Sequence, residues 1–273
     1  METLSKSYIR KILHPRKLDS HKGDYGHALI FAGSKSKMGA SVISARACLR
    51  SGVGLLTLNV PEEERVILQV CLPEAMLQFR EAIEMDLTVF SAVAVGPAFG
   101  TNEDSINLFK KILQKINKPL LLDADALTIL SKKKELIHKI PINTLLTPHP
   151  KEFDRLFGFH NTKEERIQTA ILKAKELKCI IILKDYETII TDGEKSFLNT
   201  NGNSGLAKGG SGDALTGIII SLMAQKYDLF HAAQIGVFIH GLSADLTLNS
   251  QSEESMLISD IIENIGKAFI KIG

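Results

Sequence analysis

The segment from Asn201 to Asp213 concentrates residue types that bind phosphate and move protons. Five glycines fall in the eleven residues from Gly202 to Gly212, and the apolar run that begins at Ala214 predicts a helix directly after them. Glycines let backbone N–H groups approach an anion closely, and a helix N-terminus adds about half a positive elementary charge. We therefore predict a phosphate site at the turn formed by Gly209, Gly210, Ser211 and Gly212.

Asp213 stands in the first turn of that predicted helix. The helix dipole at this position predicts a lowered pKa and an ionised carboxylate. A carboxylate beside a phosphate needs a proton to accept or a cation to share, so Asp213 is the candidate general base. The alternative is a plain Gly-rich loop in which Asp213 only caps the helix. The segment matches neither a Walker A loop nor a dinucleotide-binding fingerprint.

Three further turns follow predicted strands and carry residues suited to ligand binding. They are Gly96-Pro97-Ala98-Phe99-Gly100, Asp123-Ala124-Asp125 and Thr147-Pro148-His149-Pro150. In open α/β sheets, ligands bind beyond the carboxyl ends of the strands. His149, held between two prolines, is a candidate ligand contact. Asp123 and Asp125 either share a cation or a proton, or they brace a loop and cap a short helix.

Two more segments at strand ends have either a ligand-binding role or only a structural one. Lys184 begins the stretch Lys184-Asp185-Tyr186-Glu187-Thr188, and its side chain can reach a phosphate as a point charge. The alternative is that this stretch is only a surface turn. The first strand runs into Gly33-Ser34, and a helix starts at Met38-Gly39-Ala40-Ser41. Small residues there permit close approach of a ligand, and Ser34 or Ser41 is placed to cap the helix.

The elements that must position these residues alternate between strand and helix. Short apolar runs predict buried strands at His27–Gly33, Gly54–Val60, Thr88–Gly96, Pro119–Asp123, Thr144–Thr147 and Cys179–Lys184. Helical patterns occupy Ala40–Arg50, Asn102–Lys115, Thr162–Leu177, Ser211–Gln225, Leu229–Leu248 and Ile258–Ile270. Glu187–Asn201 predicts an antiparallel hairpin that turns at Asp192-Gly193 on a sheet edge. The alternation predicts an α/β fold, with helices on both faces of a mostly parallel central sheet.

The composition of the chain narrows the classes of protein to which it can belong. With 33 basic and 31 acidic residues the net charge is +2, which does not favour a nucleic-acid partner. Cys48, Cys71 and Cys179 form no CxxC pair, so a reducing, cytoplasmic location is expected. No apolar run approaches the ~18 residues that span a bilayer, so no membrane association is expected. Without repeats or linkers, residues 1–273 are predicted to form a single domain.

These segments, in this order, resemble the ADP-dependent NAD(P)H-hydrate dehydratases of the ribokinase-like superfamily. The matching stretches are His21–Ser34 with Met38–Ser41, Gly96–Gly100, Leu121–Leu127, Thr147–Phe153 and Gly202–Gly217. The resemblance covers nearly the whole chain. It implies a ribokinase-like three-layer αβα sandwich, a single dehydratase domain and a homo-oligomer, a tetramer in this family.

The function that the resemblance implies is repair of nicotinamide cofactors. The family dehydrates (6S)-hydrated NADH or NADPH to NADH or NADPH, with ADP as co-substrate, AMP and phosphate as products, and Mg²⁺ as cofactor. The implied contacts with the hydrate are Ala40, Gly100, His149 and Asp213. The implied contacts with the adenine nucleotide are Lys184, Asp185, Tyr186, Glu187, Thr188 and Gly212.

Four positions depart from the family pattern. Asp185 and Ala98 each replace a common glycine, and Ser204 replaces a common proline. Lys208 replaces a common threonine beside the phosphate turn, where it can strengthen anion binding.

Two rival functions stay open. The first rival is a small-molecule kinase of the same superfamily that phosphorylates a vitamin-type alcohol. The second is a non-catalytic nucleotide-binding protein, against which the retained Asp213 argues. The sequence leaves open the Mg²⁺ ligands, the choice between NADH and NADPH, and the choice between ADP and ATP.

Overall fold

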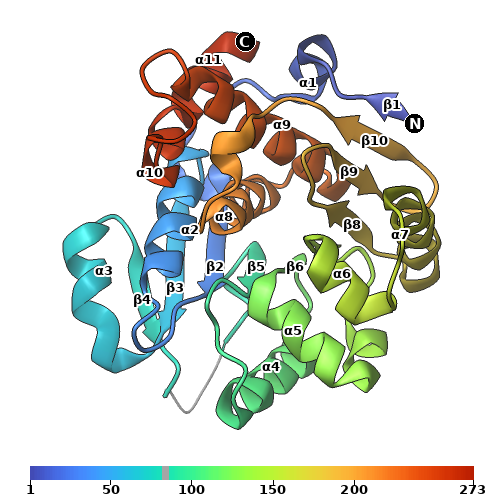
Figure 1. Cartoon of the computed structure of the whole chain (residues 1–273). Helices are drawn as coiled ribbons and strands as arrows, with labels where there is room; N and C mark the ends of the chain where they lie inside the picture. Colours follow the sequence, from blue (N-terminus) through green and yellow to red (C-terminus); the bar gives the residue numbers. More distant parts are fainter. Residues whose placement is uncertain (82–85) are drawn as a thin grey trace.

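A ten-stranded sheet forms the centre of the computed structural model, which describes residues 1–81 and 86–273. The strand order is β1-β10-β9-β8-β7-β6-β5-β2-β3-β4 (Figure 1). The strands are β1 (Glu2–Thr3), β2 (His27–Phe31), β3 (Leu55–Val60), β4 (Met76–Phe79), β5 (Ala92–Val95), β6 (Leu120–Leu122), β7 (Leu145–Leu146), β8 (Ile180–Leu183), β9 (Thr188–Thr191) and β10 (Ser196–Asn199). Within the described strands, β9 alone runs antiparallel to its neighbours.

Helices cover both faces of this sheet (Figure 1). One layer holds α2 (Gly39–Arg50), α8 (Ser211–Ala224), α9 (Leu229–Thr247), α10 (Ile258–Glu263) and α11 (Ile265–Ile272), with α1 (Lys6–Ile12) against α9 and α11. The other layer holds α4 (Glu103–Lys115), α5 (Ala124–Lys132), α6 (Pro150–Phe157) and α7 (Lys163–Leu177). The short helix α3 (Arg65–Cys71) connects β3 to β4.

Alternate residues of each strand feed two separate cores. In β2, Ala28 and Ile30 join the core under α2 and α8, whereas Leu29 and Phe31 join the core under α4 and α5. Successive side chains of a strand point to opposite faces, so a strand covered on both sides must be apolar throughout. The predicted three-layer αβα architecture with a mostly parallel sheet is confirmed.

The predicted elements appear in the predicted order, with shorter strands and two corrections. The hairpin of β9 and β10 is antiparallel, but its position at the sheet edge was wrong, because β1 pairs with β10 beyond it. The last predicted helix is interrupted at Asn264, whose side-chain Nδ2 donates to the Asp260 carbonyl oxygen. Such side-chain bonds compete with the backbone ladder of a helix. Four elements, β1, α1, α3 and β4, have no counterpart in the sequence prediction.

The packing of α2 against α8 brings the starts of these two helices together at one edge of the sheet. A β-carbon on Gly217 of α8 would lie 2.1 Å from the Ser44 carbonyl oxygen of α2, so this close approach requires glycine. At the far ends of the two helices, Gln225 Nε2 donates to the Ser51 carbonyl oxygen at 2.9 Å. The two helices therefore run in the same direction, and both begin at the carboxyl edge of the sheet. The strand order switches at β2, which has β3, the next strand of the chain, on one side and β5 on the other.

Candidate active site

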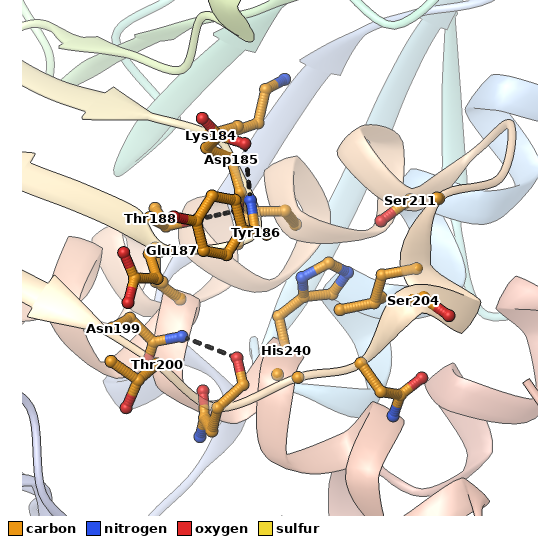
Figure 2. Close-up of a pocket in the computed structure, with 18 of the residues that line it drawn as sticks. Lys184, Asp185, Tyr186, Glu187, Thr188, Asn199, Thr200, Ser204, Ser211 and His240 are labelled. Atoms are coloured by element: carbon orange, nitrogen blue, oxygen red, sulfur yellow. Dashed lines mark hydrogen bonds between the residues drawn. The ribbon is translucent and has the colours of Figure 1, made fainter. Parts of the chain in front are cut away.

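A cavity of about 770 Å³ opens beside the start of α8. Most residues that the sequence assigned to the nucleotide line it, together with His149: Lys184, Asp185, Tyr186, Glu187, Thr188, Ser211 and Gly212. Figure 2 shows the loop from Lys184 to Thr188 on one side of the cavity and Ser211 on the other. Gly209 and Gly210 precede α8 and lie outside the lining.

Asp213 lies in the first turn of α8, next to Gly212 of the cavity wall. Burial raises the pKa of its carboxyl to about 7, and the negative charge of Asp123 adds to the effect. The predicted lowering of this pKa by the helix dipole was therefore wrong. A partial charge at the helix start is outweighed by the loss of hydration and by nearby carboxylates. With a pKa near neutrality, Asp213 is well matched to accept a proton.

Asp123, which is buried, and Lys184, which lines the cavity, form an ion pair beneath the Gly-rich turn. Lys184 Nζ donates to Asp123 Oδ1 at 2.8 Å, and Thr216 Oγ1 of α8 donates to Asp123 Oδ2 at 2.9 Å. A β-carbon on Gly212 would lie 3.2 Å from Lys184 Nζ, so the turn lies directly over the ammonium. In Figure 2 the ammonium end of Lys184 points away from the Tyr186 ring.

For Asp123 and Asp125, the geometry favours the bracing alternative. Ala124 between them adopts a left-handed backbone conformation with φ of 45°, which breaks the alternation of a strand. Asp125 instead accepts a hydrogen bond from the Gly100 backbone N–H at 2.8 Å. The two acids therefore brace different parts of the site, Asp123 the start of α8 and Asp125 the loop after β5.

Glu152 adds a second acid behind Lys184, at 4.0 Å from its Nζ. Burial alone lowers the pKa of Lys184, but Asp123 and Glu152 together raise it above its ordinary value. Burial raises the pKa of Glu152. Sequence reasoning missed Glu152, although its place three residues after His149 is a capping-box pattern. The Glu152 side chain accepts from the His149 backbone N–H at 2.9 Å.

His149 caps α6 with one ring nitrogen, and its other ring nitrogen, Nε2, lies 3.6 Å from Glu152 Oε1. Its Nδ1 accepts from the backbone N–H groups of Lys151 and Glu152 at 3.1 and 3.3 Å. Burial lowers the pKa of the ring, and the nearby Lys184 ammonium lowers it further, which favours the neutral ring. Pro150 occupies the first turn of α6.

His240 and Asn199 are cavity residues that sequence reasoning missed. His240 of α9 projects its ring into the cavity between Tyr186 and Ser211 (Figure 2). Burial lowers the pKa of His240 to about 4, which keeps the ring neutral. Among the described residues, His240 Nε2 and Asn199 Oδ1 are buried atoms without a hydrogen-bond partner in the protein. Both residues stand in apolar or strand-like sequence that carries no functional signal.

Ala40 and Gly100, which the sequence assigned to the hydrate, lie at the same sheet edge but outside the cavity lining. Ala40 stands in the first turn of α2, the helix that starts beside α8. Capping of α2 by Ser34 or Ser41 was wrong: the N-cap is Met38, and Ser41 Oγ donates to the Met38 carbonyl oxygen.

Arg80 is a further residue at this edge that no sequence signal revealed. Its guanidinium donates to the carbonyl oxygens of Phe99 at 2.9 Å and Ala32 at 3.0 Å, and also to that of Gly33. Burial lowers its pKa to about 10. Arg80 thereby ties the loop after β2, which leads into α2, to the loop after β5, which carries Gly100.

The departures from the family pattern have specific structural settings. Lys208 Nζ donates to the carbonyl oxygens of Glu253, Glu254 and Met256, so it ties the Gly-rich loop to a neighbouring loop and its role in strengthening the anion site was wrong. Asp185 is exposed, and its carboxylate accepts from the Tyr186 backbone N–H at 2.8 Å. Ala98 has a left-handed φ of 48°, the conformation that favours glycine.

Comparisons with known proteins place this chain in a family. The family model described as NAD(P)H-hydrate dehydratase matches residues 28–267. The chain belongs to this dehydratase family. It is 33% identical to the ADP-dependent (S)-NAD(P)H-hydrate dehydratase of Bacillus subtilis, an alignment that covers 97% of this chain and 98% of the relative.

Other members of the dehydratase family are longer. The bifunctional NAD(P)H-hydrate repair enzyme Nnr of Thermofilum pendens is 32% identical over 94% of this chain, which spans only 52% of that relative. The chain thus spans about half the length of several curated relatives that it matches.

Solved structures of the dehydratase family have the same fold. The crystal structure of ADP/ATP-dependent NAD(P)H-hydrate dehydratase from B. subtilis, co-crystallised with ATP and Mg²⁺, superposes with a TM-score of 0.88 at 29% identity, over 100% of this chain and 99% of that one. A ribokinase-like superfamily protein from Enterococcus faecalis superposes with a TM-score of 0.87 at 26% identity, over 100% of this chain and 96% of that one. The predicted ribokinase-like fold is confirmed.

Proposed function

We propose that this chain restores NADH or NADPH from the (6S)-hydrated forms, coupled to conversion of ADP to AMP and phosphate. Membership of the dehydratase family supports the reaction class. The observation that carries the chemistry is Asp213, a partly buried carboxylate with a pKa of about 7 at the start of α8. Next to it lies a cavity large enough for a nucleotide.

In the proposed reaction, Asp213 accepts the proton of the C6 hydroxyl of the hydrated ring. The freed oxygen attacks the terminal phosphorus of ADP, and the bond from that phosphorus to the AMP oxygen breaks. The ring nitrogen lone pair then expels the new phosphate group with its oxygen, and loss of the C5 proton to solvent restores the ring double bond. Hydroxide is a poor leaving group and phosphate a good one, which explains the need for ADP.

The start of α8 supplies the electrostatic part of this reaction. The backbone N–H groups near Ser211 and Gly212 and the helix dipole stabilise negative charge on the transferred phosphoryl group. Lys184, Asp185, Tyr186, Glu187, Thr188, Gly209 and Gly210 complete the proposed nucleotide site, and Ala40, Gly100 and His149 the proposed hydrate site.

Mg²⁺ fits this site as a companion of the nucleotide. Across residues 1–81 and 86–273, no group of three or more His, Cys, Asp or Glu side chains is arranged to hold a metal ion. Mg²⁺ usually keeps several waters and binds substrate phosphates, so it would be held mainly by the phosphates of the nucleotide. Asp123 is not available to it, because Lys184 and Thr216 occupy its two carboxylate oxygens. When bound, it would neutralise charge on the phosphates.

The test is an assay with hydrated NADH and ADP. The expected result is NADH absorbance and free phosphate in equal amounts, with no stable phosphorylated product. A lasting phosphate ester of an alcohol would identify a small-molecule kinase instead. Nucleotide binding without turnover would identify a non-catalytic protein. Asp213→Asn is expected to bind ADP and to lose turnover by roughly a thousandfold or more.

The proposal extends to the organisation of the protein. We propose one domain over residues 1–273, since β1 at the start of the chain joins the sheet beside β10 and α11 at its end packs against α9. A homo-oligomer, a tetramer as in the family resemblance, is supported by the exposed apolar side chains of Val66 and Val70 on α3.

All three cysteines are free thiols, which supports a reducing, cytoplasmic location. Among the described residues, no helix has the length and apolar character needed to cross a membrane.

A further inference from the structure

Asp123 contacts two other elements of the site although it is itself shielded from the cavity. It is 1% exposed and lies at the junction of β6 and α5. One carboxylate oxygen accepts from Lys184 at the end of β8, and the other accepts from Thr216 in α8. Thr216 stands three residues after Asp213, so it lies on the same side of the helix. Asp123 thus connects the helix that carries the proposed base to the cation beneath the phosphate turn.

We propose that Asp123 is the positioning residue of this site: it fixes the Lys184 ammonium beneath Gly212 and holds the first turns of α8, and with them Asp213, at a set distance from that ammonium. The inference rests on the proposed role of Asp213 as the base. A loose ammonium would lie at variable distances from the transferred phosphate, and small displacements of a catalytic group cost much of its effect. Glu152, at 4.0 Å from Lys184 Nζ, is too distant to replace the hydrogen bond of Asp123.

Asp123 also acts on Asp213 through its charge, because a negative charge disfavours ionisation of a second carboxyl close by. The other charges that face Asp213 are Lys184 at the end of β8, Asp125 at the start of α5 and Glu152 of α6. These three residues are not replaced in an Asp123 variant, so a change in the pH profile reports on the lost Asp123 charge and on the release of Lys184.

The experiment compares Asp123→Asn with Thr216→Val, in the full chain, with hydrated NADH and ADP as substrates. Asp123→Asn removes the charge and keeps the shape and an oxygen acceptor. We expect at least a tenfold loss of kcat and an acid limb of kcat/KM that moves to lower pH, by about one unit. Thr216→Val removes only the anchor of α8. We expect a severalfold loss of kcat with the acid limb unmoved, and Thr216→Ser, which keeps the hydroxyl, is expected to recover most of the rate.

Two results would overturn the inference. One is a folded Asp123→Asn protein with wild-type kcat and an unmoved acid limb. The other is a wild-type kcat in Thr216→Val, and this result decides the matter if Asp123→Asn does not fold. Asp213→Asn distinguishes failure of this inference from failure of the proposed function. Turnover by Asp213→Asn would refute the role of Asp213 as the base. An inactive Asp213→Asn, together with an unmoved acid limb in Asp123→Asn, would refute only the role of Asp123. Thermal unfolding of each variant shows whether lost activity follows lost folded protein.

Discussion

The fold shields much of the Asp213 carboxyl from water. This shielding makes the carboxylate a better base, but it lowers the stability of the folded protein. Its pKa of about 7 makes the carboxylate a stronger base than an exposed aspartate. The folded state therefore holds a proton that the unfolded state releases near pH 4. Between these values, the contribution of Asp213 to the free energy of unfolding falls as pH rises. The group thus weakens the fold at the pH where it is ready to accept a proton.

The first residue-scale prediction concerns pH. Because the base must be ionised, we expect kcat/KM to rise with pH up to about 7 and then to level off, since the pKa of Asp213 is about 7. The rate of the purified protein, measured from pH 5 to 9 with constant ionic strength, checks this. An acid limb near pH 4 would mean that the base is an ordinary exposed carboxyl.

The second concerns stability at the same residue. Asp213→Asn removes a buried charge, so we expect the free energy of unfolding at about pH 8 to rise by about 1–3 kcal/mol, with little change at about pH 4. Urea unfolding at both pH values measures this. An equal effect at both would show that packing, not ionisation, accounts for the change. The gain would also show that the inactive variant is folded.

The third concerns Ala98, whose φ of 48° is unfavourable for any residue with a β-carbon. We expect Ala98→Gly to raise the free energy of unfolding by about 0.5–1 kcal/mol, because the relieved strain exceeds the added entropy of the unfolded chain. Ala207→Gly is the matched control: Ala207 has a φ of −77° in an exposed loop, so glycine should lower stability slightly. Destabilisation by both changes would show that Ala98 is not strained.

At the scale of elements, the close contact of α2 and α8 keeps the starts of the two helices together. The fourth prediction compares two helical glycines. We expect Gly217→Ala to lower the free energy of unfolding by about 2–4 kcal/mol, because the new methyl group would overlap the Ser44 carbonyl oxygen, 2.1 Å away. Gly266→Ala in α11 has no neighbour within 4 Å and should stabilise by about 0.5 kcal/mol. A neutral Gly217→Ala would show that the helices can move apart.

The same scale shows what sequence reasoning could and could not predict. The strand β8 is apolar throughout, β2 is apolar after His27, and the glycine cluster precedes a long apolar helix, so the layers and the phosphate turn follow from local pattern. Contacts between segments that are distant in the sequence do not follow from local pattern. Nothing local indicates that Asp123 faces Lys184 and Thr216, or that Arg80 reaches the carbonyl oxygens of two loops. The pKa of Asp213 was mispredicted for the same reason, because its burial depends on the whole fold.

For the molecule as a whole, both ends of the chain pack onto the same sheet and helix layer. The strand β1 pairs with β10, and α11 packs against α9. The fifth prediction is therefore a single cooperative unfolding transition, as expected of one domain. Far-ultraviolet circular dichroism and tyrosine fluorescence should give the same midpoint, and the absence of tryptophan makes the tyrosine signal usable. Two separated transitions would contradict the proposed single domain.

The shielding of Asp123 has a consequence for how the protein responds to salt. Dissolved ions weaken attractions between charges that they can surround, but Asp123 is 1% exposed, and a nucleotide in the cavity would cover Lys184 at the cavity wall. Raising sodium chloride should slow the capture of an anionic nucleotide from solution, since that encounter is steered through open water. Once the nucleotide is bound, turnover should proceed at nearly the same rate in dilute and in concentrated salt.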